Sequence, residues 1–141
     1  MGMFAGIEEV KIMKQSRYVE PGNYVGKINA VKYGTTNQDM KPYFVVEVEV
    51  VESDTPDFNP GDTIAWMTML HKYKHYFLEE VKGFVSAITQ SSPDEVTEEV
   101  VECVAGEDQP LAGVPIGIRA WSETNNNSGR SFTRSEFRRL N

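Results

Sequence analysis

Residues 43–53 read YFVVEVEVVES, and this stretch decides which fold we expect. Every second residue is apolar, and this apolar set consists of Phe44, Val46, Val48 and Val50. The positions between them are occupied by one valine and two glutamates. Successive side chains of a β-strand point to opposite faces, so the pattern predicts an antiparallel strand with one face in the core and one in water.

Two further predicted strands flank this one. Residues 21–34 (PGNYVGKINAVKYG) begin with turn residues and then alternate, and residues 63–70 (TIAWMTML) are rich in β-branched and large apolar side chains. Residues 35–41 and 56–62 between them carry turn-forming residues. We therefore expect a three-stranded meander, with Trp66 in the core because it shares the parity of Ile64.

The apolar period changes after Leu70. Within residues 73–89 the apolar positions recur at steps of three and four, which predicts an amphipathic helix. A second helix is predicted to start at Ser92 as N-cap, with Pro93 in its first turn and Glu95 closing a capping box; its buried stripe would be Val96, Val100 and Val104. Nine carboxylates between Glu79 and Asp108 face only Lys82, so residues 71–110 form a helical acidic insert.

Strand character resumes after the insert. Residues 111–123 (LAGVPIGIRAWSE) and 131–140 (SFTRSEFRRL) predict two strands joined by a loop at 125–130. Three strands, helices and two strands predict one mostly β domain over residues 1–141, a five-stranded OB-like Greek-key barrel whose first strand pairs with its fourth. Residues 1–20 would be an N-terminal extension, and a generic α+β sandwich is the alternative.

The composition fits one such domain. The chain has 141 residues, a formal net charge of -7 and one cysteine, Cys103, so it has no internal disulfide. There is no long apolar run and no secretory leader pattern. We expect an intracellular, cytoplasmic protein without a membrane span.

The cations are concentrated near the two ends. Residues 119–141 contain five arginines against Glu123 and Glu136, and residues 11–43 contain six basic side chains against two acidic ones. If the fold brings these regions together, a cationic face on an anionic body would suit a polyanionic ligand. The alternative is that each charge run is simply a solvated face.

Aromatic side chains accompany these cations. Single-stranded nucleic acid is bound by cations along its phosphates and by aromatic faces on which its bases stack. Arg119 and Trp121 are two residues apart and so share a strand face, although Trp121 as a core aromatic is the alternative; Phe132 and Phe137 differ in parity, so one of them belongs to the core. The candidate single-stranded-DNA-binding residues are Lys27, Lys32, Tyr33, Tyr43, Arg119, Trp121, Arg130, Phe132 and Arg134.

Catalytic and metal motifs give no competing interpretation. Phosphate-binding Walker loops, GxSxG elbows and cysteine–histidine clusters are absent from the sequence. His71, His75 and Glu79 are spaced by four but do not form HExxH, and Glu47 and Glu49 are explained by strand alternation. We expect no enzymatic activity, metal or cofactor.

Several segments together resemble a known family. YVEPGNYVGKINAVKYG (18–34), PYFVVEVEVVES (42–53), WMTML, KGFVSAI and LAGVPIGIRAW make residues 18 onward similar to bacteriophage OB-fold single-stranded-DNA-binding proteins. The resemblance implies a non-catalytic protein that coats single strands in phage replication or recombination in the host cytoplasm.

One feature departs from many single-strand binders, which end in an acidic tail that recruits partners. This chain ends in RRLN, so residues 95–108 in the acidic insert are the better candidate for binding replication or recombination proteins. The alternative function is a phage structural or adaptor protein whose basic C-terminal hairpin docks on an acidic partner.

Overall fold

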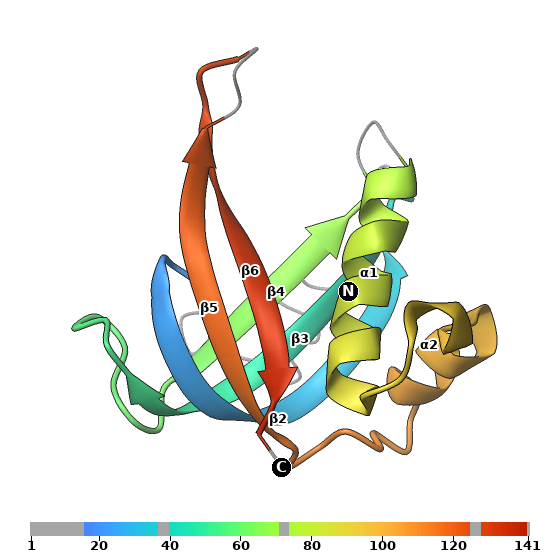
Figure 1. The fold of residues 1–141 in the computed structure, drawn as a ribbon, viewed down its shortest axis with the longest axis horizontal. Coiled ribbons are helices and arrows are strands. Elements are labelled where there is room, and N and C mark those ends of the chain that lie inside the picture. Colours follow the sequence, from blue (N-terminus) through green and yellow to red (C-terminus); the bar gives the residue numbers. More distant parts are fainter. Residues whose placement is uncertain (1–15, 37–39, 71–73, 125–127, 141) are drawn as a thin grey trace, which may run out of the picture.

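A computed structural model describes residues 16–36, 40–70, 74–124 and 128–140. The element order is β1 (Ser16–Tyr18), β2 (Gly22–Thr35), β3 (Pro42–Ser53), β4 (Thr63–Met69), α1 (Lys74–Thr89), a 3-10 turn (Pro93–Glu95), α2 (Glu98–Val104), β5 (Pro115–Thr124) and β6 (Ser131–Arg139). The protein is therefore mostly β, with two helices between β4 and β5, as the sequence predicted (Figure 1).

Strand β3 lies between β2 and β4, and its alternation sets the two faces of the sheet. The apolar set of β3 is at most 1% exposed, whereas Glu49 is exposed. We call the side facing this core the inner face and the opposite side the outer face. Cross-strand partners share a face, so Ile64 on β4 and Ile28 on β2, both opposite Val48, complete the core here.

Strand β2 is long because it pairs with two strands. Residues 22–27 pair with β5 and residues 24–35 with β3, which confirms the pairing predicted between the strands at 21–34 and 111–123. Register shifts after Val25 and after Ile28 mark bulges, which bend and twist a strand. Gly26 lies at the first bulge, where a Cβ atom would come within 2.5 Å of the Glu49 carbonyl oxygen. The bulges let β2 curve around the core, as Figure 1 shows.

The sheet is open, in the order β1-β4-β3-β2-β5-β6. In the described part of the chain, β4 and β6 are not paired, so the backbone closure expected of a barrel is not seen. Aromatic side chains connect these strands instead: the Phe137 ring of β6 lies 4.9 Å from Trp66 of β4 and 5.0 Å from Phe84 of α1. Trp66 is 8% exposed, which confirms its predicted place in the core.

Helix α1 buries the apolar face that the sequence predicted, whereas α2 begins at a different residue from the one predicted. In α1 the buried residues are Val81, Phe84, Val85 and Ile88. The Glu95 side chain accepts a hydrogen bond from the Ser92 backbone N–H at 3.0 Å, but this box closes only the 3-10 turn. Val96 is extended, and α2 begins at Glu98 with Thr97 as its N-cap. The predicted start at Ser92 is wrong because Thr97 caps the Val100 N–H and begins a new helix.

Part of the predicted N-terminal extension belongs to the sheet. Ser16–Tyr18 pair in parallel with the start of β4, and the Val19 N–H donates to the Ala65 carbonyl at 2.9 Å. Val19 is 8% exposed and belongs to the core, whereas Tyr18 is 63% exposed; residues 1–15 lie outside the described part. A three-residue strand is too short to show a clear alternation, which explains why the sequence pattern missed it.

None of the described helices has the length and apolar character needed to cross a membrane.

Candidate nucleic-acid interface

Strand β5 separates core from surface residue by residue. Ile116 and Ile118 are 0% and 2% exposed on the inner face. Arg119 is exposed and Trp121 half-buried, and their parity places both on the outer face, as strand alternation predicted. The register of β5 with β6 then sets Glu136 opposite Arg119 and Arg134 opposite Trp121.

Trp121 is on the surface of the sheet and not in the described core. The Cζ atom of Arg119 lies 5.3 Å from the centroid of the Trp121 ring, which is cation–π distance. The indole Nε1–H donates to Glu123 Oε2 at 2.7 Å. The alternative interpretation of Trp121 as a core aromatic is therefore wrong, since the core on this side is filled by Ile118, Ala120 and Phe137.

The two phenylalanines of β6 divide as their parity predicted. Phe132 is 40% exposed and lies opposite Glu123 on the outer face. Phe137 lies opposite Ile118 and packs against the core. Phe132 is thus an aromatic side chain available to a ligand, and Phe137 is a structural one.

The arginines of the hairpin differ in how strongly they are engaged. Arg134 Cζ lies 5.7 Å from the Tyr76 ring of α1, and Arg134 Nε lies 3.8 Å from Glu123 Oε2. Burial raises the pKa of Tyr76, Glu80 raises it further, and Arg134 opposes these effects. Arg130 is exposed next to the loop, where its N–H donates to Ser128 Oγ at 3.3 Å. Arg134 is therefore already engaged by side chains of the protein, whereas Arg130 is exposed to solvent.

The remaining candidates lie at the other end of β2. Lys32 Nζ is paired with Glu47 Oε1 at 2.9 Å. The Tyr43 ring lies across Gly34, where a Cβ atom would meet Tyr43 Oη at 2.9 Å. Tyr33 is 53% exposed but opposite Phe44, so its parity is that of the inner face. These side chains do not form one cationic face, because Lys32 is neutralised and Tyr33 does not share the face of Tyr43.

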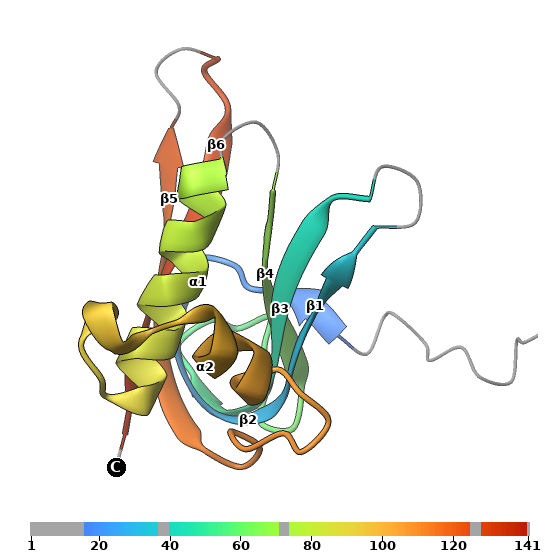
Figure 2. The same cartoon turned by 90° about the vertical axis from the view of Figure 1, so that its right-hand side faces the viewer.

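The predicted residues therefore fall into two groups. The hairpin group consists of Arg119, Trp121, Arg130, Phe132 and Arg134, and the turn group of Lys32, Tyr33 and Tyr43. Gly22 pairs with Ala120, and Lys32 follows it ten residues later, which corresponds to roughly 30 Å along an extended strand. Lys27, exposed and opposite Pro115, lies between the groups. Figure 2 shows the β5–β6 and β2–β3 hairpins extending on the same side of the molecule, with the end of β4 between them.

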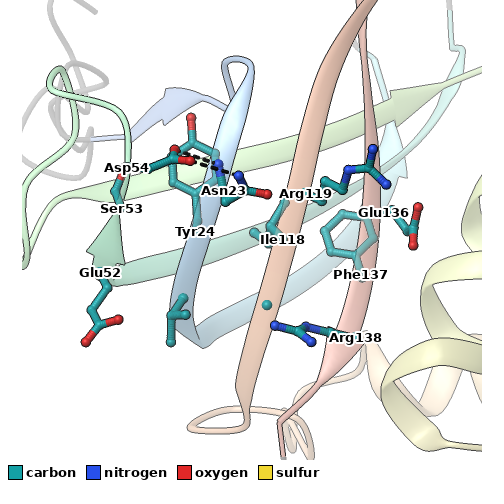
Figure 3. Close-up of a pocket in the computed structure, with 12 residues that line it drawn as sticks. Asn23, Tyr24, Glu52, Ser53, Asp54, Ile118, Arg119, Glu136, Phe137 and Arg138 are labelled. Carbon is teal, nitrogen blue, oxygen red and sulfur yellow. Dashed lines mark hydrogen bonds between the residues drawn. The ribbon is translucent and has the colours of Figure 1, made fainter.

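A groove of about 510 Å³ adjoins the hairpin group, between the ends of β2 and β3 and the strands β5 and β6 (Figure 3). Its lining includes Arg119 and also Arg138, which the sequence interpretation did not select. Arg138 has the parity of Arg134 and Glu136, so alternation alone places it on the outer face. The Arg138 side chain covers Gly117, and this contact depends on the register between β5 and β6.

Carboxylates also line this groove, and one of them is fully engaged. Asp54 accepts hydrogen bonds at 2.8 Å from both the backbone N–H and the side-chain amide of Asn23. These bonds lower the pKa of Asp54, the backbone bond most strongly. Glu52 and Glu136 are exposed at the margins of the groove. The groove is thus of mixed charge, because Arg119 and Arg138 share it with the three carboxylates.

The two helices of the acidic insert differ in position: α1 packs against β6, with Tyr76 beside Arg134, whereas α2 lies away from the hairpin. Figure 1 shows α2 on the side of α1 opposite β6. Its glutamates Glu98, Glu99 and Glu102 are exposed, in agreement with the prediction that they stay in water. A polyanion on the hairpin would therefore avoid the glutamates of α2, but Glu79 and Glu80 of α1 lie close to Arg134.

The described residues offer no metal site of three or more histidine, cysteine or acidic side chains. His75 Nε2 lies 2.8 Å from Glu79 Oε1 on the exposed surface of α1, and His71 lies outside the described residues. Of the two strand carboxylates, Glu47 is paired with Lys32 and Glu49 is exposed. Alternation and ion pairing explain these side chains.

Comparison with known proteins does not assign the chain to a family: no protein-family model matches it, and no curated protein matches it either. The resemblance to phage single-strand binders therefore stays a prediction. What the structure provides is an exposed sheet face on which cations and aromatic rings lie side by side.

Proposed function

We propose that the protein is a non-catalytic single-stranded-DNA-binding protein that coats single strands during phage replication or recombination. The observation that carries this proposal is the pair of Arg119 and Trp121 on the outer face of β5, with the guanidinium 5.3 Å from the ring centroid. A half-buried indole outside the core has a face on which a base can stack, and the arginine beside it can contact the phosphate of the same nucleotide.

The neighbouring side chains extend this surface. Phe132, 40% exposed, adds a second ring toward the hairpin tip, and Arg130 adds a cation directed to solvent. Stacking is tolerant of sequence because every base has a π-face, and phosphate contacts carry no sequence information. We therefore expect binding with little sequence preference.

The strand order supports an OB-like barrel as the scaffold. Three antiparallel strands, two helices and a hairpin follow one another, and β2 lies between β3 and β5. The aromatic contact between Trp66 and Phe137 joins the strands that a closed barrel would pair through their backbones. OB-like folds bind oligonucleotides through their strand faces and loops, which agrees with a site on β5 and its hairpin.

We expect the turn group to contact the nucleic acid more weakly than the hairpin group does. Lys32 must leave Glu47 before it can neutralise a phosphate, which cancels part of the gain. Residues 95–108 of the acidic insert, whose glutamates in α2 are exposed, stay the predicted docking surface for replication or recombination proteins.

Fluorescence anisotropy with labelled oligo-dT over a salt series tests the proposal. We expect binding that is tighter than to duplex of the same length and that weakens steeply as salt rises, because phosphate contacts release counterions. Equal or stronger binding to duplex, or no binding at low salt, would refute the proposal. The second outcome would favour the docking of an acidic protein on the hairpin.

A further inference from the structure

The side chain of Arg138 lies flat across β5 at Gly117. A Cβ atom at position 117 would come within 2.8 Å of Arg138 Nε and 3.2 Å of its Cγ atom. Only glycine leaves this space free. Arg138 thereby reaches from the edge strand β6 over its neighbour β5 (Figure 3) and into the groove that Arg119 also lines.

The two arginines are placed by one strand register. Gly117 is paired with Arg138, and Arg119 follows two positions later on the same face of β5. Two residues along a strand correspond to roughly 6.6 Å. In Figure 3 the two arginines lie on either side of Ile118 along β5, and the Arg119 guanidinium, which lies 5.3 Å from the Trp121 ring centroid, points away from that of Arg138. Arg119 must therefore turn toward Gly117 to share a ligand with Arg138.

Glu136 is the nearest carboxylate by strand register, since it lies opposite Arg119 and two positions before Arg138. In the described part of the chain no carboxylate lies within ion-pair distance of Arg119 or Arg138. Both oxygens of Asp54 are occupied by Asn23, and Glu52 points away from Arg138 in Figure 3. Gly117 and Val25, which are paired across β5 and β2, line the groove next to Arg138 and are uncharged.

We infer that Arg119 and Arg138 form a two-arginine clamp that holds one phosphate of the bound strand over Gly117. Guanidinium groups donate paired, planar hydrogen bonds that match phosphate oxygens. A phosphate ligand is favoured over a carboxylate of a protein because Trp121, the next outer-face residue of β5 after Arg119, offers a base-stacking surface beside the clamp. The inference rests on the proposed function, and it adds Arg138 as a binding residue and a path for the bound strand along β5.

The path follows from the order of the side chains. Trp121, Arg119 and Gly117 are successive outer-face positions of β5. A strand stacked on Trp121 and clamped over Gly117 therefore runs along β5 from the hairpin toward Val25 of β2. It does not need the turn group.

Three variants test the clamp by oligo-dT anisotropy over a salt series. Arg138→Gln should weaken binding roughly tenfold and reduce the slope of log affinity against log salt by about one. Gly117→Ala leaves the charge unchanged but pushes Arg138 aside, so it should weaken binding in the same direction. Lys82→Gln, which removes one exposed cation from α1, is the matched control and should change affinity less than about twofold.

A double variant separates displacement of Arg138 from damage to the fold. If Gly117→Ala acts only through Arg138, it should have no further effect in the Arg138→Gln background. A further loss of binding in that background would overturn the mechanism, as would wild-type-like binding by both single variants. If the wild type and both single variants bind oligo-dT equally well, the clamp is refuted but the proposed function stands. If the wild type itself does not bind oligo-dT, the proposed function is refuted.

A competitor identifies the ligand class. Polyglutamate at equal charge should displace the oligonucleotide much less effectively than unlabelled oligo-dT. Equal displacement would show that the groove recognises carboxylates, and would overturn the phosphate assignment.

Discussion

The two tryptophans of the chain permit a direct test of base stacking, because one is in the core and the other on the surface. Trp66 is 8% exposed and its ring centroid lies 5.8 Å from Phe84 and 4.9 Å from Phe137. Trp121 is half-buried on the outer face, held by Arg119 and Glu123. Truncation of each should therefore affect a different property.

The expected magnitudes follow from these surroundings. Trp121→Ala removes one exposed cation–π contact and one hydrogen bond, which together contribute about 1–2 kcal/mol to folding. The loss of one base stack, about 1–3 kcal/mol, should weaken oligo-dT binding roughly 5- to 150-fold without changing the salt slope. Trp66→Ala should instead cost about 3–5 kcal/mol of stability, since it empties a core site between aromatic rings.

Single-tryptophan variants give the assay. Trp66→Phe leaves Trp121 as the one indole, and its emission should be quenched as oligo-dT stacks on it. Trp121→Phe leaves Trp66 as the matched control, whose emission should not respond because the core excludes the ligand. Urea unfolding of each variant gives the stability in parallel.

Two results would refute this reasoning. If Trp121→Ala loses as much stability as Trp66→Ala, then Trp121 is a structural residue and the outer-face site loses its main aromatic. If the variant binds oligo-dT as tightly as the wild type, no base stacks there, whatever its stability.

Three further outcomes are expected. Phe137→Ala should cost about 3 kcal/mol in urea unfolding, because its ring joins β6 to the core, whereas Phe132→Ala should cost less than about 1 kcal/mol; similar losses would contradict the division into core and surface rings. Asp54→Ala should destabilise the protein at pH 7, because the folded-state pKa of Asp54 is lowered. The difference in stability between wild type and variant should shrink as pH falls below about 3.9 and vanish below the folded-state pKa. A pH-independent difference in thermal unfolding would rule out the ionised carboxylate as its source. Replacement of the α2 glutamates by glutamine should leave oligo-dT anisotropy unchanged or modestly tighter, and a marked loss in a folded variant would place the insert at the interface; the three positions are Glu98, Glu99 and Glu102.

Local alternation accounts for most of what could be predicted. Residues 43–53 alone define a strand with a buried and a wet face, and Ile116 and Ile118 against Arg119 do the same for β5. The same rule separated Phe132 from Phe137. These predictions succeed because side chains of a strand alternate whatever that strand pairs with.

Features that depend on several segments were predicted less well. Thr97 caps α2 in competition with Ser92, and three residues of the N-terminal segment add to β4 without any clear pattern in the sequence. Lys32 was selected for its charge, but Glu47, across the strand pair, neutralises it. A sequence pattern records the type of a side chain and not its spatial neighbour.

The sequence by itself determined the order of β2 to β4, the helical insert, β5 and β6, and the outward direction of Arg119 and Trp121, because these follow from periods of two and of three to four residues. Only the tertiary structure decided that Ser16–Tyr18 pair with β4, that Trp66 meets Phe137 where backbone pairing is not seen, and that Arg138 lies over Gly117. The physical reason is that register and close packing join residues far apart in the chain, and no local period encodes which of them meet.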